Sequence, residues 1–276
     1  NPEDPDALRM ALEYAEAIGA DIVAATDPDA DRYACAIKTD TGYATLNGNQ
    51  TGALVMDYIL SGKKARGTLA PDGLVCKSIV STNLANKICN GYGLPCVEVL
   101  TGFRYISEQI DLAEKQGRTF LFGFEESYGL LTGNDSRDKD GVLAIALLCE
   151  AAAWYSKQGM TLVDAMEKLY QRHGYYKETQ KSMQFPGAKG TQEMKALMET
   201  LREETMPASI GGIGVVARRD YLTGVRAQQD GAMENIDMPS ADVLYYELEN
   251  DCWLCLRPSG TEPKLKAYVA TRANDA

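Results

Sequence analysis

Three aspartates alternate with other residues in segment 27–32, Asp-Pro-Asp-Ala-Asp-Arg, directly after an apolar run. That run, residues 20–26, predicts a buried strand, so the carboxylates would emerge at its C-terminal end. Pro28 excludes a helix here, and in an extended segment alternate side chains point to the same side. Converging carboxylates repel one another unless a cation lies between them, and hard divalent ions prefer oxygen ligands. The spacing favours a metal site over a solvated acidic turn, with ligands Asp27, Asp29 and Asp31.

A second group of polar residues occupies segment 257–264, Arg-Pro-Ser-Gly-Thr-Glu-Pro-Lys, between two predicted strands. It combines a guanidinium, two hydroxyls, an ammonium and a glycine that permits close backbone approach. These groups suit a phosphate, which charge-assisted hydrogen bonds and backbone N–H groups bind well. The Gly-Lys-Ser/Thr order of a Walker loop is absent, and an ordinary proline/glycine hairpin turn is the alternative. The candidate phosphate ligands are Arg257, Ser259, Gly260, Thr261 and Lys264.

The elements that must position these loops alternate along the middle of the chain. Predicted strands cover residues 74–80, 96–100 and 119–122, and predicted helices cover 50–60, 82–91, 103–116, 139–157 and 161–173. Such alternation predicts a parallel sheet of the α/β class, with ligands at the carboxyl ends of the strands. The loops at those ends are 81–83, 101–104 and 123–127. The last hundred residues read differently, as a strand-rich connector, a helix and four tightly turned strands, which predicts a small α+β domain.

Composition limits the classes of function. The chain has 276 residues, 45% hydrophobic and 24% charged, as expected for a soluble globular protein. A net charge of −11 argues against general nucleic-acid binding. No apolar run reaches the ~18 residues of a membrane span, and the N-terminus does not resemble a signal peptide. The seven cysteines lie mostly in apolar runs, which favours reduced thiols in a cytoplasmic protein. A single histidine, His173, gives little basis for a zinc site or a Ser-His-Asp triad.

Three motifs in order resemble one known family. Segment 27–32, segment 123–129 (Gly-Phe-Glu-Glu-Ser-Tyr-Gly) and segment 257–261 (Arg-Pro-Ser-Gly-Thr) resemble the α-D-phosphohexomutases, most closely the phosphoglucomutases. The resemblance covers essentially the whole chain. Family members have four domains. The resemblance implies that residues 1–46 form the end of the second domain, which carries the metal loop. By the same resemblance, residues 47–175 would form the third domain, which carries the sugar-binding loop. Residues 176–276 would form a connector and the fourth domain, which carries the phosphate-binding loop.

The resemblance also implies roles for individual residues. The three aspartates would bind magnesium, with Arg32 beside them in the active site. Lys139, in segment 137–141, would lie near the reacting hydroxyl for proton transfer or charge stabilisation, and a solvated helix start is the alternative. Substrate-binding residues would come from three loops, and these are Thr101, Gly102 and Arg104; Glu125 and Ser127; and Arg257, Ser259, Gly260 and Thr261. Many relatives carry lysine where this chain has Arg104, which keeps the charge but changes the donor geometry.

The family's catalytic serine lies in a Ser-His-Asn-Pro motif, which this sequence lacks. We therefore expect this chain to be a large fragment without the first domain, and to be inactive by itself. We expect magnesium to occupy the site formed by the three aspartates only weakly. The implied enzyme is a phosphotransferase that interconverts glucose 1-phosphate and glucose 6-phosphate through a phosphoserine and glucose 1,6-bisphosphate. The implied partner is a hexose phosphate, with no nucleic acid or membrane.

Several other functions fit parts of the sequence. Within the family, a phosphomannomutase or a phosphopentomutase remains open. Asp27, Asp29 and Asp31 also mimic the first ligands of an EF-hand, but Arg32 and Lys38 stand where glycine and glutamate are needed. A phosphatase with Asp27 as nucleophile leaves the other two loops unexplained. The last alternative is a non-catalytic module that binds sugar phosphates or metal.

Overall fold

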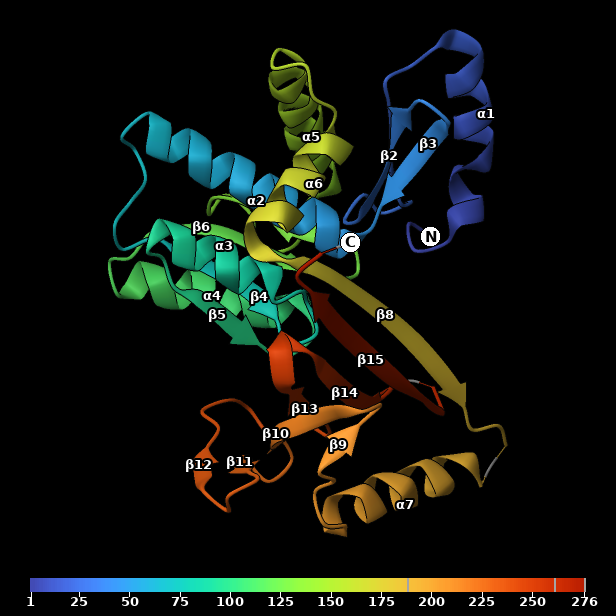
Figure 1. The fold of residues 1–276 in the computed structure, drawn as a ribbon, viewed down its shortest axis with the longest axis vertical. Helices are drawn as coiled ribbons and strands as arrows, with labels where there is room; N and C mark the ends of the chain where they lie inside the picture. The colour runs from blue at the N-terminus through green and yellow to red at the C-terminus, as the bar shows by residue number, and fades with distance from the viewer. Residues whose placement is uncertain (188, 261, 276) are drawn as a thin grey trace. The chain divides into compact units, whose positions relative to one another are not determined.

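The computed structural model describes residues 1–187, 189–260 and 262–275 (Figure 1). Thr261, one of the predicted phosphate ligands, therefore lies outside the described residues. The chain divides into two compact units, Asn1–Gly174 and Tyr175–Ala276. The division of the first unit at residue 46 remains a prediction, because residues 1–174 pack as one body.

The first unit begins with a small antiparallel sheet and its covering helix. The sheet has the order β1-β2-β3, with β1 Ile22–Thr26, β2 Tyr33–Thr39 and β3 Gly42–Leu46. The 3₁₀ turn η1 Pro5–Leu8 and helix α1 Arg9–Ile18 follow each other, and they pack Leu8 and Ala15 against β1 and β2. Gly19 ends α1 in the left-handed conformation, at φ 71°. Ile18, the last residue of α1, is 60% exposed.

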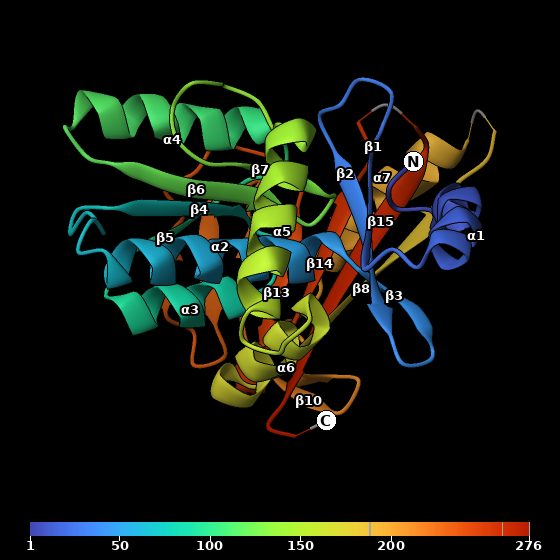
Figure 2. The same cartoon turned by 90° about the horizontal axis from the view of Figure 1, so that it is seen from above.

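A four-stranded sheet forms the centre of the first unit, with the order β5-β4-β6-β7. Strands β4 Leu74–Ser78, β5 Cys96–Val99 and β6 Phe120–Glu125 are parallel, as predicted, and the short β7 Gly129–Leu131 is antiparallel to β6. Helix α4 Phe103–Lys115 covers one face, and helices α2 Gly48–Ala65 and α3 Leu84–Tyr92 cover the other (Figure 2). Strand β7 was missed by the sequence analysis, because three residues are too few for a pattern.

Helices α5 Gly141–Ser156 and α6 Leu162–His173 complete the first unit. Their N-caps are Asp140, which accepts from the Leu143 N–H, and Thr161, which forms a capping box with Asp164. Helix α5 contacts β1 and β2 of the small sheet and also β7 and α2. It therefore holds the acidic segment and the four-stranded sheet in one body.

The second unit is one antiparallel sheet with a helix on it. The strands run in the order β12-β11-β10-β13-β14-β15-β8, with β9 paired to β10. Their bounds are β8 Tyr175–Gln184, β9 Ser209–Ile210, β10 Ile213–Asp220, β11 Val225–Gln228, β12 Met233–Asn235, β13 Leu244–Leu248, β14 Trp253–Pro258 and β15 Lys264–Ala273. A 3₁₀ turn, η2 Glu249–Asp251, links β13 to β14. Helix α7 Gly190–Glu203 packs Met194 and Met198 against Val215 and Leu244.

The strand-rich connector predicted over residues 175–185 is a regular strand of the second unit's sheet. Residues 175–184 form β8, which pairs with β15 along its whole length, from Tyr175 opposite Ala273 to Gln184 opposite Lys264. Its outer residues are exposed and polar, which is typical of an edge strand and explains why the pattern was ambiguous.

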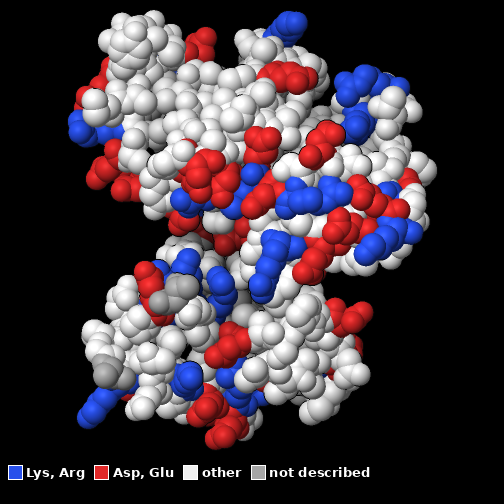
Figure 3. All heavy atoms as spheres, turned by 180° about the vertical axis from the view of Figure 1, so that it is seen from behind, with Lys and Arg blue, Asp and Glu red and all other residues white. Residues whose placement is uncertain are grey.

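The surface carries charges of both signs. On the face shown in Figure 3, basic and acidic side chains are interspersed. Among the described residues, no helix is both long and apolar enough to cross a lipid bilayer. All seven cysteines are free.

Candidate active site

The three aspartates of segment 27–32 converge. One carboxylate oxygen from each of Asp27, Asp29 and Asp31 lies within 4.8 Å of the other two. Asp27 is buried, Asp31 is partly buried and Asp29 is exposed. The convergence agrees with the sequence analysis, but the expected reason is wrong. The segment is a turn, in which the Ala30 N–H donates to the Asp27 carbonyl and Ala30 is left-handed at φ 58°.

Arg32 holds the turn closed. Its backbone N–H donates to Asp27 Oδ1 at 3.0 Å, and its Nε donates to Oδ2 of the same carboxylate at 2.8 Å. Burial by itself would raise the pKa of Asp27, but the hydrogen bonds and the charge of Arg32 outweigh burial and lower that pKa. Asp27 is therefore a carboxylate fixed in position at the bottom of the cluster.

Lys139 reaches the cluster from the segment before α5. Its Nζ lies 2.5 Å from Asp31 Oδ2 and 3.4 Å from Asp138 Oδ1. Burial would lower the pKa of Lys139, but the hydrogen bond to Asp31 and the charges of both aspartates outweigh burial and raise it. Lys139 is therefore a cation in this arrangement, and it can neutralise charge beside the carboxylates.

Two glycines permit this close approach. A Cβ on Gly129 would lie 2.6 Å from Cδ of Lys139. A Cβ on Gly141, the first residue of α5, would lie 2.7 Å from the Arg32 carbonyl oxygen and 2.8 Å from that of Ala30. The Gly141 N–H also donates to the Ala30 carbonyl at 2.9 Å. The start of α5 and the acidic turn therefore fit together only while position 141 lacks a side chain.

Segment 123–129 is a tight hairpin between β6 and β7, and Glu125 is the last residue of β6. Its buried carboxylate accepts a hydrogen bond from the Gly102 N–H at 2.6 Å, which brings loop 101–104 to the hairpin. Gly102 has φ 117°, a conformation that favours glycine. Ser127 is partly buried at the tip of the hairpin. Thr101 is also partly buried, whereas Arg104 is exposed and stacks on Tyr105.

The hairpin is tied directly to the acidic turn. The Tyr33 N–H, just after the turn, donates to the Tyr128 carbonyl at 3.2 Å, and the two tyrosine rings meet edge to face. Tyr128 is left-handed, at φ 66°, a strained conformation that non-glycine residues rarely adopt. Glu126 points to the neighbouring loop instead, where it accepts from Ser78 Oγ at 2.8 Å. Loops 81–83 and 123–127 were both predicted to lie at the carboxyl ends of strands, but the sequence did not predict that Ser78 and Glu126 contact each other.

The third loop lies in the second unit, between β14 and β15. The Ser259 N–H donates to the Lys264 carbonyl at 2.8 Å, which closes the loop. Lys264 forms an ion pair with Glu262. Among the described residues, no hydrogen bond or ion pair is formed by the partly buried Arg257 side chain, so it can accept an anion. Gly260 is exposed, with no atom within 4 Å of where a Cβ would lie.

The acidic turn has the donor set that a hard divalent cation requires. Three carboxylates within 4.8 Å offer oxygen atoms only, without thiol or imidazole ligands. Magnesium commonly keeps several waters and takes few protein carboxylates, which suits an open cluster with an exposed Asp29. The residues present therefore fit a magnesium ion.

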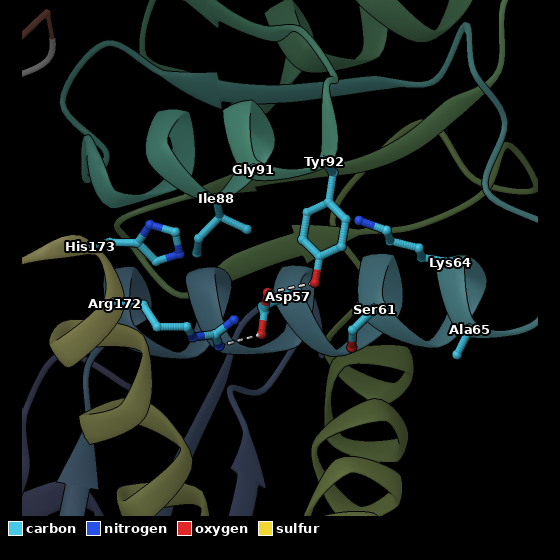
Figure 4. Close-up of a pocket in the computed structure, with 9 residues that line it drawn as sticks. All are labelled: Asp57, Ser61, Lys64, Ala65, Ile88, Gly91, Tyr92, Arg172 and His173. Atoms are coloured by element: carbon cyan, nitrogen blue, oxygen red, sulfur yellow. Dashed lines mark hydrogen bonds and ion pairs between the residues drawn. The ribbon is translucent and has the colours of Figure 1, made fainter.

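A separate pocket of about 400 Å³ lies among α2, α3 and the end of α6 (Figure 4). Asp57, buried on α2, accepts from Tyr92 Oη at 2.9 Å and from Arg172 Nη2 at 3.1 Å. Lys64 lies over the ring of Tyr92. His173 also lines the pocket, and burial together with the nearby Arg172 charge lowers its pKa. The Asp57 carboxylate therefore joins three helices, and its role there is structural.

Family comparisons match nearly the whole first unit. Residues 47–173 match the model described as phosphoglucomutase/phosphomannomutase, alpha/beta/alpha domain III, and residues 1–42 match the model of domain II. A phosphoglucomutase of Staphylococcus epidermidis is 37% identical over 273 residues, covering 98% of this chain and 48% of that protein. A phosphoglucomutase of Staphylococcus aureus is 36% identical over 277 residues, covering 100% and 49%. The chain thus spans about half the length of the curated relatives it matches.

A solved structure shows the same fold. The crystal structure of a phosphoglucomutase/phosphomannomutase family protein from Burkholderia thailandensis aligns with a TM-score of 0.64 at 16% identity. The alignment covers 99% of this chain and 47% of that chain. The match extends over both compact units, including the second, antiparallel one.

Proposed function

The chain belongs to the phosphoglucomutase/phosphomannomutase family, and we propose that it supplies the metal, sugar and phosphate sites of a phosphoglucomutase. The reaction would interconvert glucose 1-phosphate and glucose 6-phosphate through a phosphoserine and glucose 1,6-bisphosphate. One observation carries this proposal: Lys139 pairs with Asp31 and packs against Gly129, which holds the acidic turn beside hairpin 123–129. Phosphoryl transfer depends on this kind of positioning and charge neutralisation.

Asp27, Asp29 and Asp31 would hold magnesium, which when bound acts as a Lewis acid on a phosphoryl oxygen. Arg32 would keep Asp27 ionised and oriented through its two hydrogen bonds to that carboxylate. Because the carboxylates alone repel a phosphate, cations at the edge of the cluster are needed as well. Lys139 is suited to this, since it is held protonated beside Asp31 and can neutralise developing charge or donate a proton.

The sugar and the distant phosphate would be held by the other loops. We propose that Glu125 and Ser127 bind sugar hydroxyls, with Thr101, Gly102 and Arg104 lining the same side. The Gly102 bond to Glu125 supports this pairing of loops. Arg257, Ser259, Gly260, Thr261 and Lys264 would bind the non-reacting phosphate, which a guanidinium without a partner among the described residues favours. The bisphosphate intermediate must bind in either orientation, so these loops would receive both ends of the sugar.

A phosphomannomutase is the second candidate, because the matching family models carry both activities in their description. Glucose and mannose differ at one hydroxyl, which a single hairpin does not distinguish by residue type. The free cysteines support a reducing, cytoplasmic location for either enzyme.

A coupled assay tests the proposal. The 276 residues contain no Ser-His-Asn-Pro motif, so the chain alone should bind the substrate but not convert glucose 1-phosphate to glucose 6-phosphate. A polypeptide that also carries the serine motif should convert glucose 1-phosphate to glucose 6-phosphate. It should act on glucose 1-phosphate faster than on mannose 1-phosphate or a pentose 1-phosphate. Turnover by the 276-residue chain alone would contradict the proposed phosphoserine route.

A further inference from the structure

Cys89 and Cys96 lie next to each other beneath the sheet of the first unit. Cys89 is in the last turn of α3, and Cys96 is the first residue of β5. Between them the chain reverses at Gly93, at φ 70°, and the Leu94 N–H donates to the Cys89 carbonyl at 3.0 Å. This tight reversal brings the start of β5 back to the end of α3.

The strand register sets the direction of the Cys96 side chain. In the parallel pair of β4 and β5, Cys96 lies opposite Val75, and Val97 lies opposite Cys76. Cys76 and Val97 pack in the core cluster under α4. Because neighbouring residues of a strand point to opposite faces, Cys96 points to the other face, which α2 and α3 cover. There the Cys89 and Cys96 thiols are hydrogen-bonded, and Cys89 Sγ lies 3.9 Å from Met56 Sδ.

A buried lysine lies on the same face. Lys77 alternates with Cys76 along β4, and its side chain is fully buried. Its Nζ lies 3.2 Å from Glu98 Oε1 and donates to the Ser81 carbonyl at 3.0 Å. The hydrogen bond from Cys89 and the Lys77 charge lower the pKa of Cys96 against the effect of burial. The same hydrogen bond, with burial, raises the pKa of Cys89.

The two thiols therefore differ in reactivity. Cys96 is partly exposed, whereas Cys89 is fully buried. A lowered thiol pKa beside a second thiol is characteristic of oxidisable dithiols. By contrast, burial raises the pKa of Cys35 to about 12. Cys149 is exposed on α5 and provides an internal comparison.

We propose that Cys89 and Cys96 form a redox-active dithiol, which a hydroperoxide converts into an intramolecular disulfide. The Cys96 thiolate attacks one peroxide oxygen, the O–O bond breaks, and a sulfenic acid forms as the first water leaves. The Cys89 sulfur then attacks Cys96 sulfur, the S–O bond breaks, and the second water leaves as the S–S bond forms. The two thiols lose two electrons and two protons, and hydrogen peroxide is reduced to two waters.

Peptide mapping tests the proposal. The chain is treated with hydrogen peroxide, remaining thiols are blocked with iodoacetamide, and the protein is digested with trypsin. The tryptic peptide Ile88–Arg104 contains both cysteines of the pair and no other. We expect the mass of this peptide to be lower than that of its reduced, unlabelled form by two hydrogen atoms. We also expect the peptide to carry no iodoacetamide label. Dithiothreitol should restore labelling of both thiols.

Variants separate the two roles. Cys89→Ser should leave a sulfenic acid on Cys96 that dimedone traps, and Cys96→Ser should leave Cys89 reduced. Lys77→Met removes the nearby positive charge and should slow oxidation of Cys96 about tenfold, without changing the rate at Cys149. The proposal is overturned if peptide 88–104 keeps two alkylated thiols after Cys149 is fully oxidised. It is also overturned if folded Cys89→Ser forms no dimedone adduct at Cys96. This second test does not depend on whether Lys77→Met folds.

Discussion

The Nζ atom of Lys139 lies 2.5 Å from Oδ2 of Asp31, so a lysine from the start of α5 neutralises an acidic turn more than a hundred residues earlier in sequence. Gly129 leaves space for the lysine chain, and Gly141 leaves space for the turn. The acidic turn and hairpin 123–129 are therefore positioned by one set of contacts within a single compact unit.

Lys139 should compete with magnesium for Asp31. We expect Lys139→Met to raise the affinity of the chain for Mg²⁺ about fivefold, since displacing a partly exposed ion pair costs on the order of 1 kcal/mol. Isothermal titration with magnesium chloride measures this. Lys157→Met, at the exposed far end of α5, is the matched control and should leave the affinity unchanged. An equal or weaker affinity in Lys139→Met would show that the lysine does not compete.

Gly141 should be essential to the docking of the turn. A Cβ there would meet two backbone carbonyl oxygens, which cannot rotate away, so Gly141→Ala should lower the free energy of unfolding by about 2 kcal/mol. It should also weaken magnesium binding. Urea unfolding of Gly91→Ala provides the control, because a Cβ at Gly91 of α3 has no neighbour within 4 Å. That helical substitution should be neutral or stabilising by up to about 1 kcal/mol. Equal effects of the two substitutions would contradict the docking.

The sequence alone identified the α/β order, the parallel strands and the convergence of Asp27, Asp29 and Asp31. It identified the last for the wrong reason, because the left-handed Ala30 of a turn cannot be inferred from residue type. Residues 175–185 were predicted as a strand-rich connector, and only the pairing with β15, almost ninety residues later in sequence, makes them a full strand of the sheet. Local patterns carry no information on such distant partners. The roles of Gly129 and Gly141 likewise depend on packing alone.

The buried Asp57 should contribute to stability. Asp57→Ala removes the hydrogen-bond acceptor of Arg172 and Tyr92 among three helices, and we expect it to lower the free energy of unfolding by about 2 kcal/mol. Asp40→Ala, on the exposed turn between β2 and β3, should have little effect. Chemical denaturation followed by circular dichroism compares them. A loss at Asp57 no larger than at Asp40 would contradict a structural role.

The second unit should lose stability in acid through Glu247. Burial would raise the pKa of Glu247, but its two hydrogen bonds from Arg226, at 2.7 and 2.9 Å, and the Arg219 charge outweigh burial and lower it. The pKa of Glu247 is lower in the folded state than in the unfolded state, so ionised Glu247 stabilises the fold at pH values above the ordinary glutamate pKa. This stabilisation is lost as the pH falls through the pKa of Glu247 in the folded state.

Urea unfolding at a series of pH values tests this. Wild type should exceed Glu247→Gln in stability at pH 7, and the difference should shrink as pH falls below about 4.3. Glu203→Gln, which is exposed at the end of α7, should match wild type throughout. A difference that is independent of pH would rule out ionisation of Glu247 as the cause.

The central claim is that this chain binds a hexose phosphate together with magnesium, and titration calorimetry with glucose 6-phosphate tests it most directly. We predict saturable binding in the presence of Mg²⁺, weakened by Glu125→Gln in the hairpin and by Arg257→Met in the phosphate loop. Asp29→Ala should abolish magnesium binding while the fold, followed by circular dichroism, stays intact. Absence of saturable glucose 6-phosphate binding to wild type, or a preference of the acidic turn for calcium over magnesium, would contradict the account.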